Sequence, residues 1–179
     1  MKITLSKASI KNAIDALDFL KDNIKVANED IVETLVGIGF KTASDINESS
    51  PQSGLTKSEV IQKITEAKTK GYVALVGPGA IYDEFGTGDE GASDPHPMKN
   101  DFPLNPYNSG PTIFYNQSIG KNQWHYGPMA GKPYFTDTGL TSGIPSGKQI
   151  YNASKEVRAR KDDVIAKELN SAVRKTNKK

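Results

Sequence analysis

An apolar stripe near the start of the chain constrains the fold most. Its members recur at steps of three, four or seven residues, which is the spacing of one helix face. They are Ile10, Ile14, Leu17, Ile24, Ala27, Ile31, Leu35 and Ile38. Ser6 is a suitable N-cap, and Ser49-Ser50-Pro51 ends any helix. We expect one amphipathic helix from Ser6 to about Ile46, roughly 60 Å long, with a break allowed at Gly37 and Gly39.

The pattern changes after the Pro51–Gly54 turn. Residues 60–67 and 71–76 are rich in β-formers and are separated by Lys68-Thr69-Lys70, which predicts a β-hairpin. Gly77-Pro78-Gly79 ends the second strand, and a short segment then leads into Gly86-Thr87-Gly88.

Residues 88–132 are rich in Gly, Pro, Asn and Asp, which predicts a long irregular segment. Its aromatic residues suggest that it folds over the body, forms short strands or meets a neighbouring protein. They are Phe102, Tyr107, Phe114, Tyr115, Trp124 and Tyr126.

Pro145 and Ser146 are expected to open a last amphipathic helix that reaches about residue 175. The order of elements predicts an α+β fold, in which a long N-terminal helix and a C-terminal helix pack on a small antiparallel sheet. We expect one domain over residues 1–179. Its parts are a helical region (1–48), the hairpin with the following segment (55–87), an inserted loop (88–132) and the last helix (145–175).

Composition narrows the classes of function. The chain has no cysteine, so disulfides and thiolate metal sites are excluded. Its start lacks a signal-peptide core and no apolar run approaches eighteen residues, so we expect synthesis in the cytoplasm and no membrane contact. The overall charge of +2 conceals an excess of about six positive charges after residue 147. These cations favour either a solvated helix end or contact with an acidic partner.

The segment Gly86-Thr87-Gly88-Asp89-Glu90-Gly91 has the spelling of a dinucleotide loop, G-x-G-x-x-G. A genuine loop of this kind follows a strand and opens a helix that binds phosphate. Residues 92–97 are predicted not to form a helix, and Asp89 and Glu90 would repel phosphate. We therefore reject a nucleotide site.

The sequence gives equally weak indications of a catalytic site and of a metal site. His96 and His125 are the only histidines, and they are separated by irregular chain, so neither a metal site nor an oriented catalytic histidine is expected. Asp83 and Glu84 are adjacent, and on a strand they would point to opposite faces and could not share a proton. We predict no catalytic, metal or cofactor residue and no enzymatic activity.

Three segments resemble a family of minor structural proteins of tailed bacteriophages, described as head–tail joining, neck or tail-completion components. Pro51-Gln52-Ser53-Gly54-Leu55 is similar to the turn after that family's first helix. Tyr82-Asp83-Glu84-Phe85-Gly86-Thr87-Gly88 resembles its most specific motif, although Asp83 replaces an apolar residue. Gly131-Lys132-Pro133-Tyr134-Phe135 is similar to the element before its last helix, with Tyr134 as an extra residue.

The resemblance implies a virion protein at the neck or head-proximal end of the tail, made in the bacterial host. It implies a ring of identical subunits that contacts connector or head-completion proteins, tail-terminator or tail-tube proteins, and passing DNA. The structural residues would be those of the three segments, namely Pro51, Gly54, Glu84, Phe85, Gly86, Thr87, Gly88, Pro133 and Phe135. Glu84 would lie on a short strand and pair with a cation or cap a turn, while Phe85 points into the core.

Two other functions remain open. The basic C-terminal helix, with Trp124 and Tyr126, could bind nucleic acid. His96 and His125 could form a metal-dependent hydrolase. Candidate interface residues for the structural role are Phe114, Tyr115, Trp124 and Tyr126.

Overall fold

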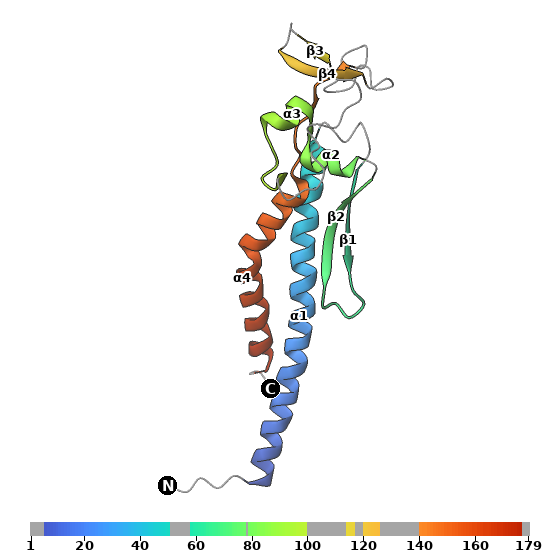
Figure 1. Ribbon diagram of the computed structural model, residues 1–179. Helices are drawn as coiled ribbons and strands as arrows, with labels where there is room; N and C mark the ends of the chain where they lie inside the picture. The colour runs from blue at the N-terminus through green and yellow to red at the C-terminus, as the bar shows by residue number, and fades with distance from the viewer. Residues whose placement is uncertain are drawn as a thin grey trace. The chain divides into compact units, whose positions relative to one another are not determined.

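The computed structural model describes residues 6–50, 58–77, 79–99, 114–116, 120–125 and 140–176 (Figure 1). The fold is α+β, as the sequence predicted. It contains a long N-terminal helix, a long C-terminal helix and a two-stranded sheet. These are α1 (Lys7–Ser49), α4 (Gln149–Thr176), and the hairpin of β1 (Glu59–Ile64) with β2 (Gly71–Val76).

Helix α1 begins where its sequence predicted. Ser6 Oγ accepts a hydrogen bond from the Ser9 N–H at 3.1 Å, which satisfies one of the unpaired amides of the first turn. The helix then continues for 43 residues to Ser49, slightly beyond the predicted end at Ile46. It does not break at Gly37 or Gly39, so the break that the two glycines allowed does not occur.

The hairpin also follows the prediction. Strand β2 has the predicted bounds, whereas β1 ends at Ile64 instead of residue 67. The earlier end has a local cause, because the Thr65 N–H donates to the Lys70 carbonyl at 2.9 Å and closes the turn there.

The segment predicted to be an irregular loop contains regular structure. Helix α2 (Ala80–Phe85) precedes it, and α3 (Gly88–Ser93), β3 (Phe114–Asn116) and β4 (Lys121–His125) lie within it. Strands β3 and β4 pair antiparallel, and β4 pairs antiparallel with β5 (Leu140–Thr141). Strand β6 (Gly143–Ile144) follows. Short strands were one of the outcomes that the aromatic residues suggested.

The chain divides into two compact units. The first unit joins residues 1–38, 62–72 and 156–179, and its buried apolar residues include Ala27, Val36 and Ala172. At its α4 end, Asn23 Nδ2 donates to Thr176 Oγ1 at 3.0 Å.

The second unit joins residues 39–61 and 73–155. Its core is centred on Ala43 of α1, Val60 of β1 and Ala153 of α4. Phe40, Val73, Leu75 and Ile150 pack around these three residues. The small size of Ala43 and Ala153 lets both helices lie close to the sheet, because neither side chain extends beyond Cβ.

Of the helices that the structure describes, none is long and apolar enough to cross a membrane.

Candidate functional site around Glu84

The motif residue Glu84 lies on a helix, not on the predicted strand. Helix α2 runs from Ala80 to Phe85 and ends at Gly86, whose φ of 76° is easily adopted only by glycine. Adjacent residues of a helix are turned by about 100°, so Asp83 and Glu84 need not point to opposite sides. Both are buried, with 1% and 8% of their surface exposed. The expectation of opposite faces on a strand was therefore wrong.

The Glu84 carboxylate caps the N-terminus of α4. Its Oε2 accepts the Ile150 N–H at 2.8 Å, and its Oε1 accepts the Tyr151 N–H at 2.9 Å. These are the second and third residues of α4, whose amides have no partner within the helix. A carboxylate there also lies at the positive end of the helix dipole. The sequence suggested that Glu84 would pair with a cation or cap the adjacent turn, whereas the element that it caps is a helix 66 residues away.

His96 is held on the same carboxylate. It is 2% exposed, and its Nε2 lies 3.1 Å from Glu84 Oε1. Its Nδ1 accepts the Met98 N–H at 3.1 Å. A ring nitrogen that accepts a hydrogen bond carries no proton, so Nε2 is the nitrogen that donates to Glu84. The expectation that His96 has no orienting partner was wrong.

Aromatic packing completes the surroundings of His96. Its ring centroid lies 4.2 Å from that of Phe85 and 5.3 Å from that of Tyr151. Phe85 is half-buried and packs here, near the end of α2, which agrees with its predicted inward orientation. The imidazole therefore packs between α2 and α4, and its hydrogen bond to Glu84 holds it against α2.

Backbone hydrogen bonds fix the chain segment that leads into α4. The Gly147 N–H donates to the Asp83 carbonyl at 2.8 Å, and the Lys148 N–H donates to the Glu84 carbonyl at 3.1 Å. Ser146 Oγ also donates to the Glu84 carbonyl. Helix α4 therefore starts at Gln149, after residues 145 and 146 that were predicted to open it. Ser146 instead contacts the end of α2.

The remaining motif residues provide close backbone contact. A Cβ at Gly86 would lie 2.7 Å from the Ser146 nitrogen and 2.8 Å from the Ile144 oxygen. Thr87 and Gly88 form isolated antiparallel bridges with Ile144 and Gly143. Thr87 Oγ1 also accepts the Ile144 N–H at 3.2 Å. The motif is thus a structural corner against residues 143–146.

Asp83 lies in a second buried polar group. Ser58 Oγ donates to Asp83 Oδ2, while Asp83 Oδ1 and Gln149 Oε1 have no partner among the described residues. Burial raises the pKa of Asp83, and the Ser58 hydrogen bond opposes this shift in part. A neutral Asp83 would supply a donor where the charged form has only acceptors.

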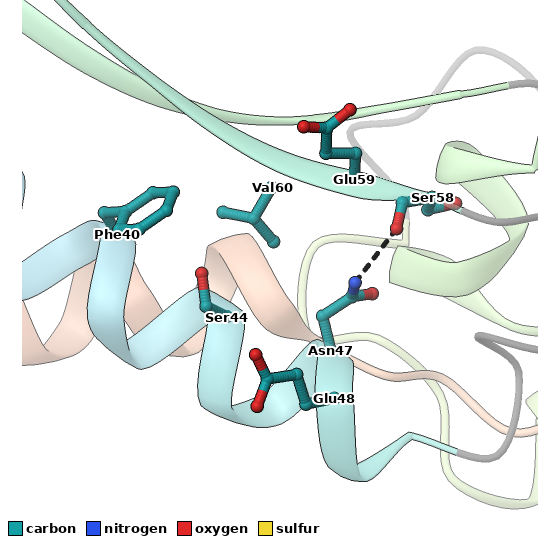
Figure 2. A pocket seen from close by; sticks show the side chains of 7 residues that line it. All are labelled: Phe40, Ser44, Asn47, Glu48, Ser58, Glu59 and Val60. Atoms are coloured by element: carbon teal, nitrogen blue, oxygen red, sulfur yellow. Dashed lines mark hydrogen bonds between the residues drawn. The ribbon is translucent and has the colours of Figure 1, made fainter.

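A cavity of about 500 Å³ lies beside Ser58, between α1 and β1 of the second unit. In Figure 2, Phe40 and Val60 face each other toward one end of this cavity. Toward the other end, Asn47 Nδ2 donates to the Ser58 carbonyl at 3.0 Å. Ser44, Glu48 and Glu59 complete the lining. The lining therefore combines hydroxyl and carboxylate side chains with the apolar Phe40 and Val60.

The site is poorly suited to catalysis. Both Glu84 oxygens and both His96 nitrogens already have hydrogen-bond partners, so neither group is available as a proton acceptor without breaking the contact between α2 and α4. Within the described ranges, no three His, Asp or Glu side chains gather closely enough to hold a metal ion.

The nucleotide-loop spelling has a different structure from the one we considered. Helix α3 includes Ala92 and Ser93, so the expectation that residues 92–97 exclude a helix was wrong for its first two residues. The element before the motif is helix α2, whereas a dinucleotide loop follows a strand. Glu90 of this segment forms an ion pair with Lys121, so a carboxylate lies where a dinucleotide loop would bind phosphate.

Several predicted residues lie outside the described part of the chain. These are Pro51, Gly54, Tyr126, Pro133 and Phe135. For Phe114, Tyr115, Trp124 and His125 the structure describes the strand backbone only, with Phe114 opposite Gln123 and Trp124 opposite Thr141. Their proposed contacts stay predictions.

Sequence reasoning missed Ser58, Gln149 and Gly147. Ser58 and Gln149 are polar residues that are 4% and 0% exposed. Nothing in their neighbours along the chain marks them as buried. Gly147 carried a weak signal, since a glycine just before a helix can permit close backbone contact. A Cβ there would lie 2.6 Å from the Asp83 carbonyl.

Comparison with known proteins adds no relative, since no family model, no curated protein and no solved structure matches the chain.

Proposed function

We propose that this chain is a non-enzymatic structural protein of a long-tailed bacteriophage. It would act at the neck or the head-proximal end of the tail, where it joins head to tail through ring-forming contacts. Its partners would be further copies of itself, the connector or head-completion proteins, and the tail-terminator or tail-tube proteins. The sequence resemblance supports this role.

The structural observation behind the proposal is the set of hydrogen bonds that the Glu84 carboxylate accepts. This residue belongs to the segment with the most specific resemblance, and its carboxylate is committed to two α4 amides and His96. A residue used in this way stabilises a fold and leaves no chemistry for a substrate. The contacts of the motif therefore support a structural role for the chain in an assembled particle.

Disruption of the gene in the parent phage tests this role. We expect filled heads and separate tails by negative-stain electron microscopy, and rescue by the wild-type gene supplied from a plasmid. Normal joined particles in the disrupted phage would overturn the proposal. Particles blocked before DNA packaging would also overturn it, because they would place the function in the head.

A second candidate is nucleic-acid binding by α4. A hollow on this helix is lined by Lys167, Asn170, Ser171, Arg174 and Lys175, which offer cations and amide or hydroxyl donors suited to phosphate. Local pairing weakens this reading, since Lys167 lies 3.3 Å from Glu168.

A salt series separates the two candidates. Nucleic-acid binding predicts retention on DNA that falls steeply with salt, and a smaller salt slope in the double variant Arg174→Gln, Lys175→Gln. Absence of retention at moderate salt would dismiss this candidate and leave the structural one unaffected.

A further inference from the structure

The first five turns of α1, residues 7–24, carry an apolar face that no described element of the first unit covers. Ile10, Ile14, Leu17 and Ile24 are 46%, 53%, 65% and 38% exposed. Farther along the same helix, Ala27 and Val36 are buried. Helix α4 ends beside Asn23, through the Thr176 hydrogen bond, and α1 continues past that end (Figure 1). We call residues 7–24 the open stretch of α1.

The open stretch has the spacing of a coiled coil. Apolar residues at steps of three and four keep one side of a helix against a partner helix with an average period of 3.5 residues. One set of core positions, called a, is Ile14, Lys21, Asn28 and Leu35. The other set, called d, is Ile10, Leu17, Ile24, Ile31 and Ile38. This spacing predicts that a second helix packs along this face.

The flanking charges select the partner and its direction. Position e, beside the apolar face, holds Lys11, Asp18 and Lys25, and position g holds Ala13, Leu20 and Ala27. In an antiparallel pair, e residues face e residues and g residues face g residues. Suppose that Ile14 of one copy faces Leu17 of the other. Lys11 of each copy then lies beside Asp18 of the other copy, and Ala13 of each copy lies beside Leu20 of the other copy.

Other registers are less favourable. A parallel pair in register would bring Lys21 of each copy together inside the seam. Shifting the antiparallel pair by one heptad places either Lys11 beside Lys11 or Asp18 beside Asp18 of the second copy. The register centred on Ile14 and Leu17 uses residues that are exposed in the single chain and pairs unlike charges twice.

We propose that the open stretch of α1 binds the open stretch of a second copy, antiparallel, with Ile14 against Leu17 and Lys11 against Asp18 of the second copy. This contact is two-fold symmetric and closes at two chains. It is separate from a ring contact, in which subunits repeat head to tail, and it does not depend on the neck role. It is also short, so we expect a reversible dimer that forms with rising concentration.

Sedimentation of the full chain over a range of concentrations tests the contact. We expect a monomer–dimer equilibrium in the wild type and a monomer in Leu17→Asp. The matched control is Val26→Asp, because Val26 is 48% exposed on the same helix but lies on another face. It should dimerise like the wild type. Circular dichroism should show that both variants keep their helix content.

Charge reversal tests the direction. Lys11→Glu and Asp18→Lys should each weaken the dimer about tenfold, and the double variant should restore it, because the pair is then re-formed with its charges exchanged. If the double variant is as weak as the single ones, the antiparallel register is wrong.

Cysteine cross-linking gives an independent measurement, since the chain has no native cysteine. The double variant Ile10→Cys, Lys21→Cys should give a covalent dimer under mild oxidation, because Ile10 of one copy faces Lys21 of the other in the proposed register. The single variant Ile10→Cys should not. In the proposed register the two Ile10 positions are separated by about eleven residues of rise, or about 16 Å.

Three results would overturn the proposal. The first is a wild-type chain that stays monomeric at the highest attainable concentration. The second is efficient cross-linking of Ile10→Cys alone, which would indicate a parallel pair. The third is equal loss of dimer in Leu17→Asp and Val26→Asp, which would place the contact elsewhere.

Discussion

The two long helices begin in different ways. Helix α1 is capped by Ser6, whose hydroxyl accepts the Ser9 N–H three residues later. Helix α4 is capped by Glu84, whose carboxylate accepts the Ile150 and Tyr151 amides 66 and 67 residues later. The first cap is exposed and the second is buried. A local cap stabilises one turn, whereas a distant cap also joins two parts of the fold, so the two should respond differently to mutation.

The largest expected effect comes from removing the distant cap. Glu84→Ala leaves two α4 amides and His96 without their acceptor in a buried site, and should lower the free energy of unfolding by about 4 kcal/mol. Urea denaturation followed by circular dichroism measures the loss. Glu84→Gln retains one oxygen acceptor and should lose about half as much. An Ala variant as stable as the wild type would show that α4 does not depend on Glu84.

Crowding the chain segment before α4 should be the next largest effect. Gly86→Ala places a Cβ within 3 Å of the backbone of Ile144, Pro145 and Ser146 at a φ of 76°, and should cost about 3 kcal/mol. The control is Gly37→Ala inside α1, where no atom lies within 4 Å of the new Cβ. It should stabilise the chain by about 0.5–1 kcal/mol, because alanine favours helix. Equal midpoints for the two variants would refute the difference between these glycines.

A pH titration should test the buried acid Asp83, which is the neighbour in sequence of the distant cap residue Glu84. The pKa of Asp83 is raised above its ordinary 3.8 by burial. An acid whose pKa is higher in the folded state favours folding in its protonated form. This contribution is complete below pH 3.8 and is lost as the pH rises through the folded-state pKa.

Asp83→Asn should remove that dependence. The amide stays neutral at every pH and can donate where Oδ1 has no partner among the described residues. We expect the variant to gain about 1 kcal/mol over the wild type near pH 7. The gain should shrink as the pH falls below the folded-state pKa. Denaturation midpoints measured from pH 3 to pH 8 would show this, and a gain that is constant with pH would contradict it.

The smallest effect is expected at the local cap. Ser6→Ala should fray the first turn of α1 by about 1 kcal/mol and leave the global unfolding midpoint unchanged. Faster hydrogen exchange of the Ser9 amide, with unchanged exchange in the hairpin, would be the supporting result. A lower global midpoint would mean that the start of α1 is coupled to the core.

The local cap and the hairpin show how much the sequence alone could predict. Ser6, the apolar stripe and the β-rich residues 71–76 act through neighbours along the chain, so the start of α1 and the bounds of β2 were predicted correctly. The end of β1 was displaced, because the Thr65–Lys70 hydrogen bond is a detail of turn geometry that composition does not reveal.

The site around Glu84 needed the tertiary structure. The motif letters marked Glu84 as a structural corner, and this reading agrees with the contacts. They did not show that residues 80–85 form a helix, that His96 is oriented by Glu84, that Ser58 donates to Asp83, or that Gln149 is fully buried. The side-chain hydrogen bonds of Asp83 and Glu84 join residues that are 12 to 67 positions apart.

The sequence by itself therefore determined the two long helices, the β1–β2 hairpin and the apolar face of α1, because periodicity and capping act within a few residues. Only the tertiary structure decided what each face and each charge contacts. The stripe of α1 has one spacing throughout, yet it is open near Ile10 and buried near Ala27, because α4 reaches only as far as Asn23. Burial depends on where another element ends, which local sequence does not encode.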